Sequence, residues 1–299
     1  MWMRRIGKVF LGLIVVVAAG AATVYAMSNS KLTKAYVVPS EPALAVANDS
    51  ATIARGEHVA RSIAKCTACH GANLGGNVVI DFAPVGHVFA TNLTKGNGGV
   101  LASYDDATLE RAIRHGIGHD GRNLIIMPSG EFHNLSDADV TALIAYIRAQ
   151  PNVDKTISKS SVGPVIRVQW LQGKVIPIGA AEINHDEKHL AVSPTGISEQ
   201  HGLYIAKNGC MGCHGAGLSG GPIPGAPPDW KPAANLTPTG LSRYSLGDFT
   251  RILQSGRRPD GSLLDSLMPI KATKLMTAEE VESVYRFLKT VPPKPYGNR

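Results

Sequence analysis

The stretches "AKCTACHGANLGG" (64–76) and "AKNGCMGCHGAGLSGG" (206–221) share one pattern. In each, two cysteines stand three positions apart, and a histidine directly follows the second cysteine. These stretches contain all four cysteines of the 299-residue chain, which are Cys66, Cys69, Cys210 and Cys213. The recurrence predicts that one chemical arrangement is built twice, in two copies of one structural unit.

The sequence after each motif recurs as well, in the same order and at offsets of about 140 to 144 residues. Chance is a poor explanation for matches in register, so we predict tandem domains at 52–151 (the first unit) and 196–292 (the second unit), joined by a linker at 152–195. The matched pairs are "NLT" at 92–94 and 235–237, "YDDATLERAIRHG" at 104–116 and "YSLGDFTRILQSG" at 244–256, "HDGRNLIIMP" at 119–128 and "PDGSLLDSLMP" at 259–269, and "LSDADVTALIAYIRAQP" at 135–151 and "MTAEEVESVYRFLKTVP" at 276–292.

Each unit is predicted to be helical, so the expected fold class is all-α. A short helix over 53–64 or 199–207 precedes the cysteine motif, and a glycine- and proline-rich loop follows it. Apolar residues at helical spacing predict a further helix from Tyr104 and another from Tyr244.

The last helix of each unit begins with a capping-box pattern. In the first unit Ser136 is followed at the third position by Asp139, and in the second unit Thr277 is followed by Glu280. The linker has alternating apolar stretches but few helix signals, and we predict an ordered strap there.

The N-terminal segment predicts export. Arg4, Arg5 and Lys8 precede the uncharged run from Val9 to Ser30, which is long enough to cross a bilayer as one helix. Because the positive charges come first, we expect residues 1–30 to anchor the chain in the inner membrane as a single span, with everything after it on the periplasmic side. The alternative is a cleaved signal peptide, with "VYA" at 24–26 as the cleavage site.

The charge distribution excludes one class of partner. The formal net charge is +7, but no basic run and no basic stripe interleaved with aromatic residues is present. Nucleic acid is therefore not an expected partner.

The C-x-x-C-H pattern indicates covalent haem attachment. Two cysteines one helical turn apart can both bond the vinyl groups of one haem, and the adjacent histidine is directed at the iron. We therefore expect two haem c groups, with iron ligands His70 and His214. A zinc site normally has closer cysteine pairs, a redox dithiol expects a βαβ context, and disulfides would not need the histidines.

Each iron needs a second axial ligand on its other face. Met127 and Met268 are each followed by proline and lie at matching places in the two units. We predict both as thioether ligands, with core packing as the alternative role. Ligation by two histidines is an alternative for the first haem only, because the second unit has no histidine after His214. The histidines available to it are His115, His119 and His133.

With these motifs the chain resembles a membrane-anchored dihaem cytochrome c, with two class I-type domains in tandem. The resemblance rests on CTACH, CMGCH, the two Met-Pro pairs and the aromatic residues of the last helices. It implies three to five helices around each haem, and proline carbonyls that accept from the histidine ligands, here those of Pro84 and Pro228. It also suggests propionate contacts from Trp230, Arg257 and Arg258.

Iron ligated by histidine and methionine has no open position for a substrate, and methionine favours a high potential. We therefore expect a non-catalytic relay of single electrons, with a periplasmic or membrane redox protein as donor and acceptor. Two other classes stay open. One is a dihaem enzyme of the peroxidase or thiosulfate dehydrogenase type, and the other is a fixed subunit of a terminal oxidase or dehydrogenase complex.

Overall fold

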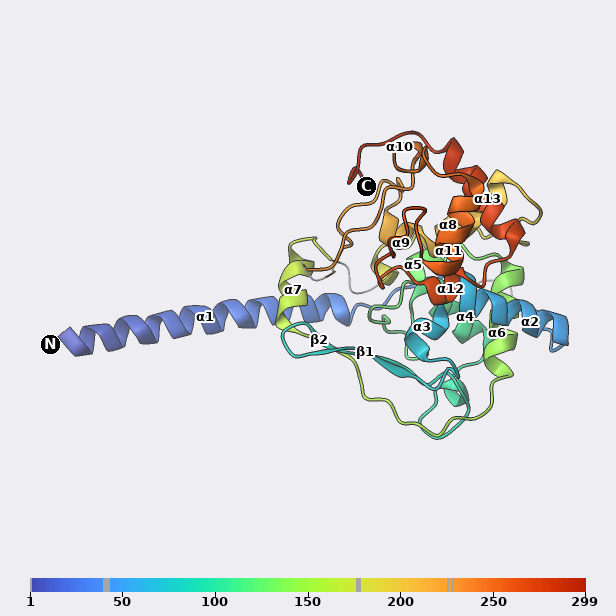
Figure 1. Ribbon diagram of the computed structural model, residues 1–299. Coiled ribbons are helices and arrows are strands. Elements are labelled where there is room, and N and C mark those ends of the chain that lie inside the picture. Colours follow the sequence, from blue (N-terminus) through green and yellow to red (C-terminus); the bar gives the residue numbers. More distant parts are fainter. Residues whose placement is uncertain (1, 40–43, 176–178, 225, 227–228) are drawn as a thin grey trace.

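The computed structural model describes residues 2–39, 44–175, 179–224, 226 and 229–299. Figure 1 shows helix α1 as a long rod projecting from a globular body of mostly short helices. The predicted all-α class is confirmed. The helices are α1 (Trp2–Leu32); α2 (Ser50–His58), the π-helical segment η1 (Val59–Ile63), α3 (Cys66–His70), the 3-10 turn η2 (Leu101–Ser103), α4 (Asp106–His115), α5 (Ser129–Phe132) and α6 (Asp137–Arg148); α7 (Pro164–Leu171) and the 3-10 turn η3 (Gly179–Ala181); and α8 (Glu199–Gly209), α9 (Met211–His214), α10 (Pro238–Leu241), α11 (Leu246–Ser255), α12 (Ile270–Thr273) and α13 (Ala278–Thr290).

The first and last helices of each unit cross in close contact. At Gly56 of α2, a Cβ atom would collide with the carbonyl of Ala142 in α6. At Gly202 of α8, it would collide with the carbonyl of Ser283 in α13. Glycine is therefore required at both crossings, because only a residue without a side chain lets the backbones approach so closely.

The first unit reaches its cysteine motif by a wider helical turn. Cys66 follows Gly56 by ten positions, whereas Cys210 follows Gly202 by eight. The structure places the longer connection in η1, where the helix widens to a π-helix before Lys65 adopts a left-handed conformation at φ 56°. Lys65, at the end of this connection, lies at the contact between the two units.

A small β-sheet is present where the sequence predicted a loop in the first unit. Strands β1 (Asn77–Phe82), β2 (Gly86–Ala90) and β3 (Ser161–Val162) pair antiparallel in the order β1-β2-β3. The sequence "NVVIDF" is rich in β-branched residues and is followed by a turn, so the strand signal was present although the glycine and proline content suggested a loop.

The linker runs along the first unit and adds elements of its own. The Asn92 side chain donates to the carbonyls of Val153 at 2.7 Å and Lys155 at 3.1 Å, which ties the start of the linker to the first unit. Further along, α7 follows Gly163 with a proline in its first turn, a helix signal that the sequence prediction missed.

Helix α7 holds the end of α1. The buried Arg167 donates to the Ser28 hydroxyl at 2.6 Å and to the Asn29 side chain at 2.8 Å, and its guanidinium lies over the Tyr25 ring. Figure 1 shows α7 beside this end of α1. The last turns of α1 are therefore packed against the folded body, while most of the rod is exposed.

The two units contact each other reciprocally. His58 of α2 pairs with Glu280 of α13 at 2.7 Å, and Tyr204 of α8 donates to Asp139 of α6 at 2.6 Å. Each of these acids is the third residue of the last helix in the opposite unit. The predicted capping box is complete at Glu280 only. The shorter Asp139 carboxylate instead accepts two hydrogen bonds from Arg55, at 2.7 and 2.8 Å.

Candidate haem-binding sites

The cysteine motifs form short helices that end at the predicted iron ligands. Helix α3 ends at His70 and α9 ends at His214. The next residues, Gly71 and Gly215, adopt φ values of 83° and 82°, which turn the chain away from each helix. Glycine adopts this conformation at little cost, so both histidines stand at an abrupt helix end.

Both histidines are oriented by a backbone carbonyl. The Nδ1 atom of His70 donates to Thr91 O at 2.8 Å, and that of His214 donates to Ala234 O at the same distance. This bond fixes the tautomer and leaves Nε2 with the lone pair that a metal ligand needs. Burial lowers the pKa of both imidazoles below the usual 6.5, which favours the neutral form that binds iron.

The proline carbonyls implied by the resemblance do not play this part. The carbonyl of Pro84 accepts from the backbone of Val165 instead, and Pro228 lies outside the described residues. The sequence contained the correct signal in the repeated "NLT", which directly follows Thr91 and Ala234. In each copy the asparagine side chain accepts from the threonine two positions later, and this local turn holds the preceding carbonyl in place.

The two methionine loops adopt the same backbone geometry. In each, the methionine carbonyl accepts the N–H two residues later at 2.8 Å, from Ser129 in the first unit and Ile270 in the second. The intervening Pro128 and Pro269 have φ near −80° and positive ψ, which is an inverse γ-turn. Met127 and Met268 both pack against the hydrophobic core.

A cavity in the second unit brings its predicted haem residues together. It has a volume of about 480 Å³ and is lined by Cys210, Cys213, His214 and Met268 among mostly apolar side chains. That volume is within the range of about 300–1,000 Å³ typical of cofactor pockets. The residues present therefore fit a haem held by two thioethers, one histidine and one methionine.

Four cationic side chains also line this cavity, namely Lys65, Lys231, Arg243 and Arg258. Arg258 is among the predicted propionate contacts. Trp230 and Arg257 do not line the cavity, and Arg257 donates to the Gly261 carbonyl instead. Sequence reasoning missed Lys231 and Arg243, since neither belongs to a recognisable motif.

In the first unit, the histidines considered as alternative ligands are engaged elsewhere. His115 and His133 pack against each other and against linker histidines, and His119 is exposed beside the Tyr104 ring. These contacts favour Met127 as the second ligand of the first haem.

The two attachment motifs adjoin at the contact between the units. Lys65, which precedes Cys66, donates to the carbonyl of Gly209, which precedes Cys210, at 2.7 Å. A second cavity, of about 800 Å³, lies between Thr67 and Ala68 of the first motif and the Met268 loop of the second unit. Lys65 and Met268 line both this inter-unit cavity and the 480 Å³ cavity of the second unit.

The sequence profile of the cytochrome c family matches residues 53–151 and 200–292. The chain therefore belongs to the cytochrome c family, whose domains carry covalently bound haem and transport electrons.

The chain is similar to cytochrome subunits of dehydrogenases. It is 28% identical over 279 residues to the cytochrome c subunit of an alcohol dehydrogenase (quinone) from Gluconacetobacter polyoxogenes, covering 83% of this chain and 57% of that protein. It is 26% identical over 281 residues to the gluconate 2-dehydrogenase cytochrome c subunit of Pantoea cypripedii, covering 83% and 61%. Over 118 residues it is 36% identical to a fructose dehydrogenase cytochrome subunit from Gluconobacter japonicus, covering 38% and 24%. The chain thus spans less than two thirds of the length of these relatives.

Proposed function

We propose that this chain is the electron-transfer subunit of a membrane-bound, quinone-linked dehydrogenase complex. It would carry two haem c groups, with no catalytic residue of its own, and α1 would anchor it in the inner membrane with both units on the periplasmic side. Three relatives with dehydrogenase partners in their names support this reading over a freely diffusing carrier. The length and apolar composition of α1 suit an anchor, although an export signal has the same character.

The roles proposed for the residues follow from their positions. Cys66, Cys69, Cys210 and Cys213 would form the thioethers, His70 and Met127 would ligate the first iron, and His214 and Met268 the second. Haem ligated in this way supplies one-electron chemistry at a high potential. The apolar walls around Met268 exclude water from the second site, while the carbonyls of Thr91 and Ala234 hold the histidines in one orientation.

The hydrogen bond from Lys65 to the Gly209 carbonyl is the observation that best supports electron transfer between the two haems. It connects the residue before one attachment helix to the residue before the other, so the two sites adjoin across a single contact. Two separate carriers that merely share a chain would not require this adjacency.

The packing of α1 supports retention of the segment as an anchor. Cleavage after Ala26 would remove Tyr25, whose ring lies 4.4 Å from the Arg167 guanidinium. The Ser28 and Asn29 contacts of Arg167 would then lie at a free chain end. Because Arg167 is buried, disturbing these contacts would cost stability.

The partnership can be tested in membranes of the native organism. The tagged chain is purified in mild detergent, and the copurifying proteins are identified by mass spectrometry. The preparation is then mixed in turn with a primary alcohol, a sugar and a sugar acid while haem reduction is followed by absorption. We expect a large catalytic subunit to copurify and one substrate class to reduce the haem. A matched preparation with Cys210→Ala and Cys213→Ala should lose half of the reducible haem.

A chain that purifies alone, and whose haem no substrate reduces in whole membranes, would contradict the complex. Peroxide consumption by the purified chain would favour the alternative of a dihaem enzyme, because that activity needs an open iron.

A further inference from the structure

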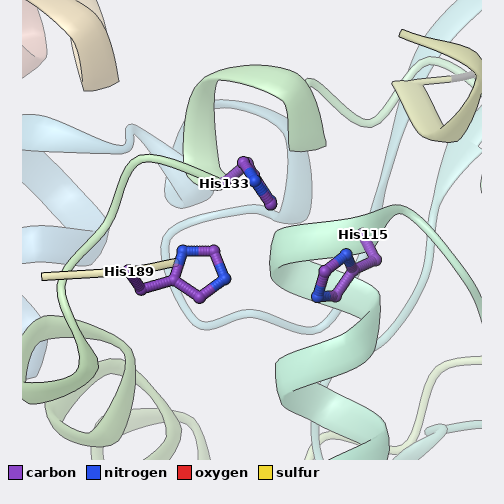
Figure 2. A group of neighbouring side chains, drawn as sticks. All are labelled: His115, His133 and His189. Carbon is purple, nitrogen blue, oxygen red and sulfur yellow. The ribbon is translucent and has the colours of Figure 1, made fainter. Parts of the chain in front are cut away.

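Three histidines that the proposed electron-transfer function does not use face one another beside the first unit. His115 ends α4, His133 follows α5, and His189 comes from the linker (Figure 2). One ring nitrogen from each lies within 4.8 Å of those of the other two. The second unit has no counterpart, since its chain contains no histidine after His214, so the fold of the repeat does not require this cluster.

The hydrogen bonds around the cluster fix which ring nitrogens carry protons. His185 donates from Nε2 to the Ala180 carbonyl at 3.2 Å, so its Nδ1 is an acceptor. His115 therefore donates from Nδ1 to His185 Nδ1 at 2.9 Å, which leaves its own Nε2 with a lone pair. His133 donates from Nδ1 to the Arg114 carbonyl at 3.3 Å, with the same result.

These lone pairs are buried without a donor. His115 is 1% exposed and His133 is 5% exposed, and the Nε2 atom of each has no hydrogen-bond partner among the residues that the structure describes. Leaving a buried acceptor unpaired costs free energy, and a bound cation would offset that cost. The backbone and His185 bonds to the opposite nitrogens are the arrangement that orients histidine ligands toward a metal.

The charge around the cluster also permits a cation. Burial, followed by the neighbouring histidines, lowers the pKa of His115 to about 3. Burial and then the Arg114 charge lower that of His189 to about 4, so both rings are neutral at pH 7. Arg114 is itself neutralised by Glu110 and Asp137, each at 2.7 Å. Glu187 places a carboxylate oxygen 4.0 Å from His133 Nε2.

We propose that His115, His133 and His189 bind a divalent transition-metal ion, with Zn²⁺ as the best match to three imidazoles. Glu187 or a water would supply the fourth ligand of a tetrahedral site. The ring nitrogens, now within 4.8 Å of one another, would have to close on the ion to reach zinc–nitrogen distances of about 2.0–2.1 Å.

The position of the site gives it a structural role. Directly after His189, the carbonyls of Leu190 and Ala191 accept the N–H groups of Asp137 and Ala138 at the start of α6. On the other side, η3 lies against the carbonyl of Met127 through Gly179. A metal here fastens the linker to the first unit, next to the loop that carries the predicted methionine ligand.

Zinc binding can be measured on the full-length, haem-loaded protein, purified without a polyhistidine tag and stripped with a chelator. Zinc chloride is titrated by calorimetry, and bound zinc is counted by mass spectrometry after gel filtration. We expect one zinc per chain in the wild type and in His119→Gln, which alters an exposed histidine outside the cluster. His189→Ala should abolish binding, and His185→Ala should weaken it by about 10–100-fold through the lost orienting bond.

His189→Ala alters a linker residue, and an unchanged haem spectrum verifies its fold. The proposal is overturned if the wild type takes up no zinc, or if His189→Ala binds zinc as tightly as His119→Gln does.

Discussion

At the scale of single residues, the predicted methionine ligands determine whether each iron has an open coordination position. We expect Met268→Ala to open the second iron, because the described walls of this cavity are mostly apolar and the other methionine among them, Met276, lies outside the Met268 loop. The far-red band of methionine ligation should fall by about half, and the reduced protein should bind carbon monoxide. Met268→His should stay closed but lower the potential, within the roughly 0.8 V range that axial ligands span.

Met276→Leu is the matched control, since Met276 lines the same cavity but directly precedes the Thr277 cap of the last helix. Its spectrum should match the wild type. If Met276→Leu bound carbon monoxide and Met268→Ala did not, Met276 would be the iron ligand and Met268 a core residue.

A second residue-scale effect concerns the ion pair between the units. Burial raises the pKa of Glu280, but its hydrogen bond and charge contact with His58, the Thr277 N–H and Arg55 outweigh burial and leave the pKa below 4.5. A depressed carboxyl pKa stabilises the fold above the unfolded value of 4.5, and this contribution is lost as pH falls through the folded value.

We therefore expect Glu280→Gln to have a lower melting temperature than the wild type at pH 7. The difference in melting temperature should shrink as the pH drops below 4.5. Glutamine keeps the capping-box geometry, so the comparison isolates the charge. Thermal melts of both proteins from pH 7 to pH 3 measure this difference. A difference in melting temperature that stays constant over the whole pH range would show that ionisation of Glu280 does not contribute to stability.

At the scale of elements, the helix crossings are the most demanding contacts. Gly202→Ala places a methyl group against the Ser283 carbonyl and the Phe287 side chain, and backbone cannot move aside as a flexible side chain can. We expect a loss of about 1–3 kcal/mol in the free energy of unfolding, measured by denaturant titration.

Gly247→Ala is the matched control within α11, where the added methyl group meets only the Ser245 hydroxyl at 3.8 Å. It should leave stability unchanged or raise it by up to about 1 kcal/mol, as alanine does in a helix. Equal losses in both variants would show that the effect is not specific to the crossing.

The helix caps show a similar dependence on context. Thr277 accepts from the N–H of Glu280, and Glu280 accepts from the N–H of Thr277, so Thr277→Ala removes one bond of a complete box. We expect a cost of about 0.5–2 kcal/mol in the free energy of unfolding, also measured by denaturant titration. A Thr277→Ser variant should retain most of this stability, and a loss equal to that of alanine would indicate a packing effect of the methyl group.

At the scale of the whole molecule, the sequence predicted the features that depend on local pattern. The repeat, the attachment motifs and the helix order could be read because each is encoded in residues close together along the chain. The helices predicted from Tyr104 and Tyr244 begin two residues later, after caps at Asp105 and Ser245. Helix ends depend on side-chain bonds that a pattern places only approximately.

Other features depend on residues far apart, and no local pattern contains them. The pairing of β2 with β3 joins segments about 75 residues apart, and the His58–Glu280 contact joins residues 222 positions apart. The hydrogen-bond partners of His70 and His214 were missed for another reason. The family resemblance pointed to proline carbonyls, whereas the repeated "NLT" directly follows the carbonyls that accept from the two histidines. The histidine cluster appears only when the linker is folded against the first unit.

The most direct test of the central claim is one spectroscopic measurement on the purified full-length protein. Covalently bound haem is counted per chain, and the spectrum is recorded oxidised, reduced, and reduced under carbon monoxide. We expect two haem c groups per chain, both low-spin, with a far-red methionine band accounting for both and no carbon monoxide binding. A single haem per chain, or a high-spin haem that binds carbon monoxide, would contradict a relay of two closed irons.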